Sequence, residues 1–305
     1  MIKLVEVKNI SKSFDSFMAV DNISFSLSKG EVLGFLGPNG AGKTTTMRVL
    51  TGFLRPDSGT VLIKNINIFD NAVSARKLIG YVPEGSPLYN EMTTIDFLTF
   101  ISDVREVKKN TELPKVIKLL NLNEVLLKKI ETLSKGFKRR VGLAQALIHD
   151  PEVLILDEPT DGLDPNQKNE VRSLIKKLGK EKAIIISTHI LEEVKAICNR
   201  TMILSEGRLL IDDKPVNVLK KSKNYNNILV SVEERSPKDL KYELLQLGKF
   251  QDIEIKDNLC SIESKNLKNN FNIANYINKK GYTIKHLSID KGNLEEVFQN
   301  LTNRK

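Results

Sequence analysis

The segment that most constrains this chain is the run of eight residues from Gly37 to Thr44, which has the spacing G-x-x-x-x-G-K-[ST]. Glycines let the backbone curl around phosphate groups without Cβ clashes, and the curl points successive N–H groups inward. Lys43 supplies a point charge for the β- and γ-phosphates, and the Thr44 hydroxyl can bind Mg²⁺. The segment is therefore typical of a phosphate loop that binds a nucleoside triphosphate.

The sequence on either side of this loop fits the expected setting. Residues 31–36 are apolar after Glu31 and predict a short buried strand, and a helix is expected from about residue 45 to residue 50. The positive end of that helix adds to the phosphate site. We expect the loop and the following residue to contact the nucleotide, namely Gly37, Pro38, Asn39, Gly40, Ala41, Gly42, Lys43, Thr44 and Thr45.

Length and composition limit the class of protein. A chain of 305 residues, 40% hydrophobic and 28% charged, is expected to form about two globular domains. Residues 2–7 have the pattern of a strand rather than of a signal peptide. No apolar run approaches the ~18–20 residues that cross a bilayer. Cys198 and Cys260 lack metal-ligand spacing, and we expect a reduced, cytoplasmic protein.

The net charge of +9 does not identify a partner. Basic residues are spread along the whole chain, which argues against a dedicated nucleic-acid face. A solvated surface rich in lysine explains the charge, and a mild attraction to anionic lipid is the alternative.

Hydrophobic patterning predicts two domains. From residue 151 onward the chain alternates between buried strands (151–156 and 183–187) and a helix (167–178), which implies a parallel sheet with crossover helices. Residues 90–150 are mostly helical in pattern, with helical spacing of apolar residues from 113 to 127. A polar stretch at 220–224 marks a boundary, so that we expect an α/β domain over residues 1–220 and a second domain over 222–305.

The second domain is expected to be a small α+β domain. Its predicted order is βαββαβ, the split-βαβ arrangement, followed by an amphipathic helix over residues 293–301. The strands are expected at 228–233, 252–256, 259–263 and 282–288, and the helices at 237–247 and 271–279. Because no catalytic side chains converge there, we interpret it as an accessory or regulatory domain rather than a second active site.

Two adjacent carboxylates follow the first of these buried strands. Asp157 and Glu158 would be costly if they were buried without a partner. Beside a phosphate loop, Asp157 can orient Mg²⁺ through water, and Glu158 can polarise the attacking water. The alternative is a strand that merely ends at the surface.

Two further segments carry candidate site residues. His189 follows the apolar run 184–186, at the strand end where ligands bind in such sheets. An imidazole there can contact the γ-phosphate and hold the water-activating carboxylate. Ser134 is a good helix N-cap and Gly136 leaves the backbone accessible, although a capped helix start alone carries no function.

Five segments in this order resemble the ATP-binding cassette (ABC) ATPases. They are the phosphate loop, residues 133–137 (the signature segment), residues 153–158, residues 161–164 and His189. The resemblance covers the first domain and implies a P-loop NTPase fold with a parallel sheet core, an antiparallel β subdomain and a helical subdomain. It also implies that the chain hydrolyses ATP with Mg²⁺ as cofactor.

The resemblance further implies how the site is completed. Two such domains, either two copies of one chain or two different cassettes, dimerise head to tail. Each ATP is held by the phosphate loop of one domain and the signature segment of the other. Ser134 and the Gly136 amide would reach the γ-phosphate across the interface, and Asp164 resembles the aspartate of the loop that crosses the dimer. Phe14 occupies the place of the aromatic that stacks on adenine, and Val20 is expected near the ribose.

This chain departs from the family pattern at three positions. In the signature segment, Lys135 replaces a glycine and Phe137 replaces a glutamine, while Ser134 and Gly136 are retained. The glutamine that the family carries after the strand at 79–82 is Glu84 here. Its carboxylate can approach Mg²⁺ or the lytic water, and it adds negative charge beside a triphosphate.

The finer pattern is similar to ATPase subunits of ABC-2 type exporters, of the drug-resistance and gliding-motility-associated types. Residues 80–84, the signature segment and residues 293–299 carry this similarity. It implies a separate polytopic permease as partner, contacted by residues 87–105. The chain would then lie in the cytoplasm, peripherally on the inner face of the cell membrane.

Two other functions are alternatives to that of a transporter subunit. Soluble ABC-type ATPases that act on nucleic acid or the ribosome carry two cassettes or a long coiled-coil insertion, whereas this chain has a single phosphate loop and no sustained heptads. A GTPase would need an Asn-Lys-x-Asp segment, which the sequence lacks. The transporter subunit is the favoured interpretation.

Overall fold

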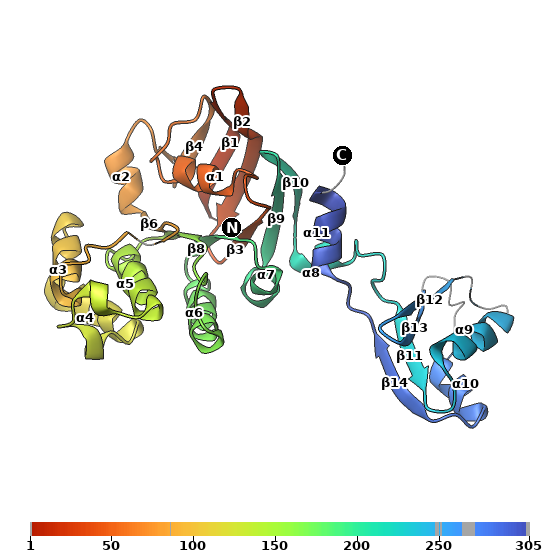
Figure 1. Cartoon of the computed structure of the whole chain (residues 1–305). Coiled ribbons are helices and arrows are strands. Elements are labelled where there is room, and N and C mark those ends of the chain that lie inside the picture. The colour runs from red at the N-terminus through yellow and green to blue at the C-terminus, as the bar shows by residue number, and fades with distance from the viewer. Residues whose placement is uncertain (1, 86, 248–249, 251, 264–271, 303–305) are drawn as a thin grey trace. The chain divides into compact units, whose positions relative to one another are not determined.

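The computed structural model describes residues 2–85, 87–247, 250, 252–263 and 272–302 (Figure 1). The chain divides into two compact units, residues 1–215 and residues 216–305. The division falls just before the polar stretch at 220–224, at the start of the short helix α8 (Pro215–Leu219). Each unit has its own sheets and its own hydrophobic core.

A six-stranded sheet forms the centre of the first unit and positions the candidate site. Its order is β10-β9-β3-β8-β7-β6, parallel except for β10, which pairs antiparallel with β9. The strands are β3 (Val32–Leu36), β6 (Ile79–Val82), β7 (Val153–Asp157), β8 (Ala183–Thr188), β9 (Arg200–Ser205) and β10 (Arg208–Asp213). Every residue of β3, β7 and β8 is buried, which is why these strands are almost continuously apolar. The expected parallel sheet is confirmed.

A second, antiparallel sheet contributes to the same core. Its order is β2-β1-β4-β5, with β1 (Lys3–Phe14), β2 (Phe17–Ser28), β4 (Ser58–Ile63) and β5 (Ile66–Asn67). Helices α1 (Lys43–Leu50) and α2 (Ala72–Lys77) lie beside these strands (Figure 1). Side chains from both sheets and from α1 form one cluster, including Val7, Ile23, Phe35, Met47 and Ile185. The phosphate loop, which lies between β3 and α1, is therefore next to a core to which both sheets contribute.

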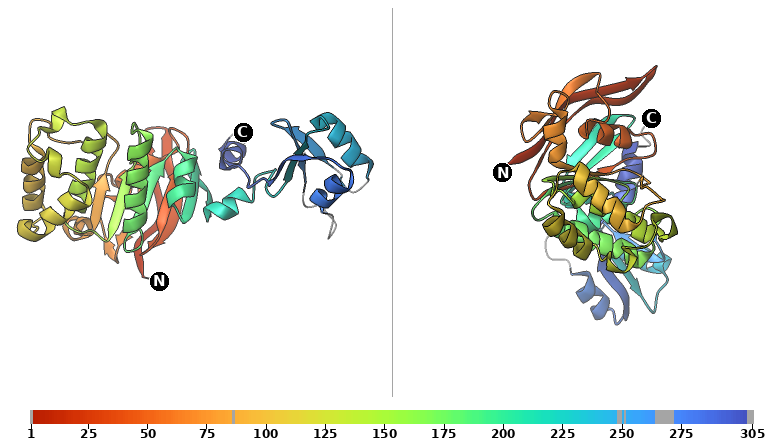
Figure 2. Two further views of the ribbon diagram at one scale, coloured as in Figure 1. Left: turned by 90° about the horizontal axis from the view of Figure 1, so that it is seen from below. Right: turned by 90° about the vertical axis from the view of Figure 1, so that its left-hand side faces the viewer.

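Apart from α1 and α2, the helices from α3 to α7 fall into two sets. Helices α3 (Thr94–Val104), α4 (Lys109–Leu119) and α5 (Lys135–Leu147) form a group apart from the antiparallel sheet (Figure 2). Helices α6 (Pro165–Leu178) and α7 (Leu191–Ile197) follow β7 and β8 as crossovers. The helical spacing from 113 to 127 is interrupted, because Asn121 has a left-handed backbone (φ +51°) and only the 3₁₀ turns η1 (Asn123–Val125) and η2 (Ile130–Thr132) follow.

The second unit is a four-stranded antiparallel sheet with the order β12-β13-β11-β14. Its elements are β11 (Ile228–Val232), α9 (Pro237–Gln246), β12 (Ile253–Lys256), β13 (Leu259–Ile262), α10 (Ile273–Lys279), β14 (Ile284–Ile289) and α11 (Leu294–Thr302). They follow the expected βαββαβ order, although Phe271, the expected first residue of α10, lies outside the described residues. Val230, Leu244, Ile262 and Ile277 are among the residues of its core.

Within residues 2–85, 87–247, 250, 252–263 and 272–302, no helix combines the length and the apolar character needed to cross a membrane.

Candidate functional site

The phosphate loop joins β3 to α1 and is shaped by close backbone contacts. Gly42 precedes α1 with a left-handed backbone (φ +95°). A Cβ at Gly42 would lie 2.3 Å from the carbonyl oxygen of Ala19 in β2, so that no larger residue fits there. Ala41 is buried in the core, and its N–H donates to the Pro38 carbonyl at 3.1 Å. The loop conformation is thus set by the packing of the first unit.

Lys43 lies at the base of the loop with only 7% of its surface exposed. Its Nζ donates hydrogen bonds to the carbonyl oxygens of Gly37 at 2.7 Å and Pro38 at 3.1 Å. Burial lowers the pKa of Lys43 below its usual value, and the nearby carboxylates of Glu158, Asp157 and Glu84 oppose that shift. The lysine is therefore held in place as a charge for an anionic ligand.

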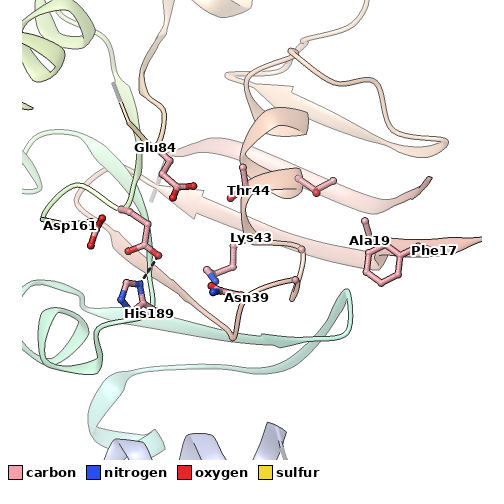
Figure 3. A pocket seen from close by; sticks show the side chains of 12 residues that line it. Phe17, Ala19, Asn39, Lys43, Thr44, Glu84, Asp161 and His189 are labelled. Atoms are coloured by element: carbon pink, nitrogen blue, oxygen red, sulfur yellow. Dashed lines mark hydrogen bonds and ion pairs between the residues drawn. The ribbon is translucent and has the colours of Figure 1, made fainter. Parts of the chain in front are cut away.

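A pocket of about 330 Å³ opens beside this loop, where β7 and β8 end (Figure 3). The phosphate loop and the start of α1 form one wall, residues after β6, β7 and β8 form another, and β2 contributes the rest. The lining residues are Asn39, Gly40, Gly42, Lys43, Thr44 and Thr45 from the first wall, Glu84, Glu158, Asp161 and His189 from the second, and Phe17 and Ala19 from β2. Ligands bind at this end of parallel sheets.

Glu158 and His189 form a pair inside the pocket. His189 Nδ1 lies 3.0 Å from Glu158 Oε1, the contact drawn as a dashed line in Figure 3. In the tautomer with the proton on Nδ1, that nitrogen donates a hydrogen bond to the carboxylate. Glu158 has a left-handed backbone (φ +48°), and its N–H donates to the Ser187 carbonyl at 3.0 Å. The two side chains are held in one geometry by adjacent strands.

Asp157, at the end of β7, is a buried carboxylate without a hydrogen bond. It is 1% exposed, and neither of its oxygens has a hydrogen-bond partner within the described chain. A buried carboxylate without hydrogen bonds is costly to stability. Lys43 is a nearby positive charge, and a divalent cation or its bound water would supply the missing contacts. The position fits Mg²⁺ held mainly by phosphate oxygens, the Thr44 hydroxyl and water, with few protein ligands.

The remaining donor chemistry agrees with this fit. Glu84 and Asp161 also line the pocket, and both are labelled in Figure 3. With these carboxylates around the pocket, a triphosphate would meet repulsion unless a cation accompanied it. In the described parts of the chain, no group of three or more His, Cys, Asp or Glu side chains could hold a metal alone. The donor set therefore suits a cation that arrives with a nucleotide.

The signature residues do not line this pocket. Ser134 caps α5 by accepting the N–H of Phe137 at 3.3 Å, as expected. Asp164 caps α6 by accepting the N–H of Gln167 at 3.0 Å. Gly136 lies against the amide of Gln167, so that a Cβ at Gly136 would come within 2.4 Å of that side chain. Ser134, Gly136 and Asp164 thus gather around the starts of two helices, apart from the pocket lining.

The structure differs from the sequence-based expectation in the region expected to contact adenine and the ribose. Phe14 is exposed at the end of β1 and does not line the pocket, whereas its cross-strand partner Phe17 does. Val20 has no exposed surface and packs in the core, and Ala19 lies at the pocket instead. Strand alternation identifies Phe17 and Ala19 as sharing one face, but it does not show which face meets the loop. Phe17 and Ala19 were not among the residues expected at the pocket, and Asp161 was named only as part of the segment 161–164.

The fold and the phosphate loop together define a P-loop ATPase. Comparison with known proteins gives the family. Residues 20–161 match the family described as ABC transporter. The chain is 42% identical over 213 residues to the uncharacterized ABC transporter ATP-binding protein YhcH of Bacillus subtilis (strain 168), which covers 69% of this chain and 70% of that protein. It is 37% identical over 223 residues to the bacitracin transport ATP-binding protein BcrA of Bacillus licheniformis, covering 72% of each.

A solved structure described as an ATP-binding subunit of an ABC transporter superposes with a TM-score of 0.66 at 27% identity, over 72% of this chain and 92% of the other. The chain belongs to the family of ABC transporter ATP-binding proteins. It is an ATPase whose hydrolysis of ATP is coupled to transport, and the resemblance drawn from its motifs is confirmed.

Proposed function

We propose that this chain energises an exporter by closing on a second cassette, head to tail, around two ATP molecules. One observation carries the proposal: Lys43, Glu158 and His189 face one pocket, while Ser134 and Gly136 lie outside its lining. A site that lacks its signature segment is completed when another chain supplies one. The second cassette is either another copy of this chain or a related one.

The roles of the residues follow from their positions. Lys43 and the N–H groups of the loop bind the phosphates, and Mg²⁺ near Thr44 and Asp157 would neutralise their charge. Glu158 lies where it can accept a proton from the attacking water. His189 holds that carboxylate through Nδ1 and presents Nε2 toward the γ-phosphate. Glu84, which lines the same wall of the pocket as Glu158, is proposed to contact the cation or the water.

Substitution of Glu158 tests this assignment. Glu158→Gln keeps the size of the side chain and removes its basicity, so that ATP binding is expected to persist while steady hydrolysis falls by about 10²- to 10³-fold. Gel filtration with ATP is expected to show a trapped dimer. Glu192→Gln, at an exposed position, is the control. Hydrolysis by Glu158→Gln at the parent rate would remove Glu158 from the catalytic role.

The adenine is proposed to stack on Phe17, because that ring lines the pocket and is 56% exposed. Phe17→Ala is expected to raise the KM for ATP by about tenfold with little change in kcat, since stacking contributes about 1–3 kcal/mol of binding. Phe14→Ala removes an aromatic ring just across the hairpin and serves as the matched control. A larger rise in KM for Phe14→Ala than for Phe17→Ala would return the adenine to Phe14.

The permease is proposed to contact residues 87–105, which include α3. Tyr89 and Phe100 are 57% and 41% exposed there, with ring centroids 5.8 Å apart. Tyr89 also packs edge-on against the buried Phe97, with ring centroids 6.0 Å apart. Exposed aromatic rings are favoured at protein interfaces. Through this contact the chain would be attached to the cytoplasmic face of the membrane, in a transporter of the ABC-2 exporter type.

The second unit is proposed to be an accessory or regulatory domain, with residues 222–305 as the separable part. It has a core of its own. The pocket described above is lined only by residues of the first unit. The ATPase reaction therefore does not need side chains from residues 222–305 for the half-site that the structure describes.

A further inference from the structure

Glu193 in α7 is a buried carboxylate that joins three parts of the first unit. It is 1% exposed. Its Oε2 accepts a hydrogen bond from the Thr188 hydroxyl at 2.8 Å, and its Oε1 accepts one from the Thr160 hydroxyl. Arg172 Nη2 in α6 lies 3.9 Å from the same Oε1. One side chain therefore connects the loop after β7, the end of β8 and α6.

The two threonines stand next to the proposed catalytic pair. Thr160 follows Glu158 by two residues, and Thr188 immediately precedes His189. The Thr188 hydroxyl also accepts the N–H of Ile190 at 3.0 Å, which fixes the turn that carries His189. Both threonines are buried. The segments that present Glu158 and His189 are thus tied to one carboxylate behind the pocket.

A structural purpose alone explains this carboxylate poorly. Burial raises the pKa of Glu193, and so does the nearby charge of Glu158, while the Thr188 hydrogen bond, Arg172 and Lys168 oppose that rise. Replacing such buried polar groups with apolar ones of similar volume is often neutral or stabilising. Glu192, the adjacent residue in α7, is exposed and avoids this cost. The cost in stability of burying the Glu193 carboxylate indicates that this side chain fixes the positions of the segments to which it is hydrogen-bonded.

We propose that Glu193 is a positioning residue for ATP hydrolysis, which sets the distance between Glu158 and His189 by holding Thr160 and Thr188 on one carboxylate. The inference rests on the proposed roles of Glu158 and His189. It also couples the loop over residues 158–164, which includes Asp164, to the end of β8. A displacement of about 1 Å in a catalytic pair can reduce the rate about 10²-fold.

The test uses the full chain and variants at the two hydrogen-bonded residues, Thr160 and Glu193. Thr160→Val removes the hydroxyl with little change in volume, and Thr160→Ser retains it. We expect Thr160→Val and Glu193→Gln to lower kcat by roughly 10- to 100-fold, with the KM for ATP and the melting temperature close to those of the parent. Thr160→Ser is expected to restore at least half of the parent kcat, and Glu192→Gln, on the same helix, is expected to match the parent.

Combination of the two changes gives a second readout. If Glu193 and Thr160 act as one unit, Thr160→Val with Glu193→Gln loses little more than either single variant, because coupled residues are not additive. Additive losses would overturn the proposal. Losses in kcat for Thr160→Ser as large as those for Thr160→Val would do the same, since they would point to packing.

The outcome separates this inference from the proposed function. Should Glu158→Gln be inactive while Thr160→Val and Glu193→Gln hydrolyse ATP at the parent rate, the positioning role fails and the catalytic role of Glu158 stands. If Glu158→Gln keeps the parent rate, the catalytic role proposed for Glu158 is wrong, independently of the results for the Glu193 variants.

Discussion

The two units of this chain treat buried polar groups differently. Six buried side-chain atoms without a hydrogen bond belong to His149, Asp157, Arg172, Ser187 and Thr201, all in the first unit. Within 216–247, 250, 252–263 and 272–302 the second unit shows none. There, Asn227 donates to Ser261 Oγ at 3.2 Å, and Glu243 accepts from two tyrosines.

Among the described residues, the difference distinguishes the unit that carries the candidate ATP pocket from the second unit. Three of the five unsatisfied residues, Asp157, Arg172 and Ser187, lie at or behind the ends of β7 and β8, where ATP is proposed to bind. Native proteins leave few buried polar groups unpaired, and those that persist collect at functional sites. We propose that the buried carboxylate of Asp157 costs stability in the first unit and that the cation of a bound nucleotide supplies its missing partner.

The largest expected effect concerns the unsatisfied carboxylate. Asp157→Asn should reduce ATP hydrolysis by about 10²- to 10³-fold, because a neutral amide holds a hydrated cation poorly. The melting temperature of the chain without nucleotide should stay equal or rise, since a buried carboxylate without hydrogen bonds is removed. Steady-state hydrolysis and thermal unfolding measure both.

The control for this variant is Asp252→Asn, an exposed aspartate of the second unit, which should change neither quantity. A fall of several degrees in the melting temperature of Asp157→Asn would contradict the comparison, because it would mean that the protein alone stabilises that charge.

A second prediction separates the units physically. Deletion of residues 222–305 removes the core of the second unit and no pocket residue. The remaining chain should fold and bind ATP with an affinity within about threefold of the parent, as expected for an independent domain. Nucleotide titration and circular dichroism measure this. Loss of folded, nucleotide-binding protein on truncation would sink the two-domain interpretation.

The smallest expected effect is on pH dependence. Burial, followed by the charge of Arg105, lowers the pKa of His149 from 6.5 to about 4. The unfolded chain therefore binds a proton below pH 6.5 that the folded chain refuses until about pH 4. The stability that neutral His149 contributes is complete above pH 6.5 and is lost as the pH falls toward 4, by about 2 kcal/mol at pH 5.

Urea unfolding at pH 7 and pH 5 measures this effect. His149→Gln should weaken the loss of stability at pH 5, and His286→Gln, at an exposed position of the second unit, should leave it unchanged. Equal behaviour of the two variants would show that His149 is not a source of the pH dependence.

Much of the fold follows from the sequence because its signals are local. The apolar runs that became β3, β7 and β8, and the Ser134 cap of α5, depend on neighbouring residues alone. The order β12-β13-β11-β14 depends on pairing between distant strands, and periodicity does not specify it. The sequence showed the order of elements in the second unit but not the order of strands in its sheet.

The site was predictable where a motif fixes geometry and not where tertiary packing does. Lys43, Asp157, Glu158 and His189 lie where their motifs placed them, although their roles remain proposals. The resemblance pointed to Phe14, whereas its direct cross-strand partner Phe17 lines the pocket, a difference that depends on tertiary packing. Glu193 gave no signal, since an acidic residue in the first turn of a helix is ordinarily a surface group.

The contact between Gly42 and Ala19 has a consequence for ligand affinity. The loop that binds phosphates and the strand that lines the base side of the pocket touch backbone to backbone, so they form one preorganised surface. Little conformational entropy is lost there when ATP binds. Adaptation to a different base or a shorter phosphate chain would therefore require a shift of β2 and the loop together, which makes this half of the site selective through rigidity.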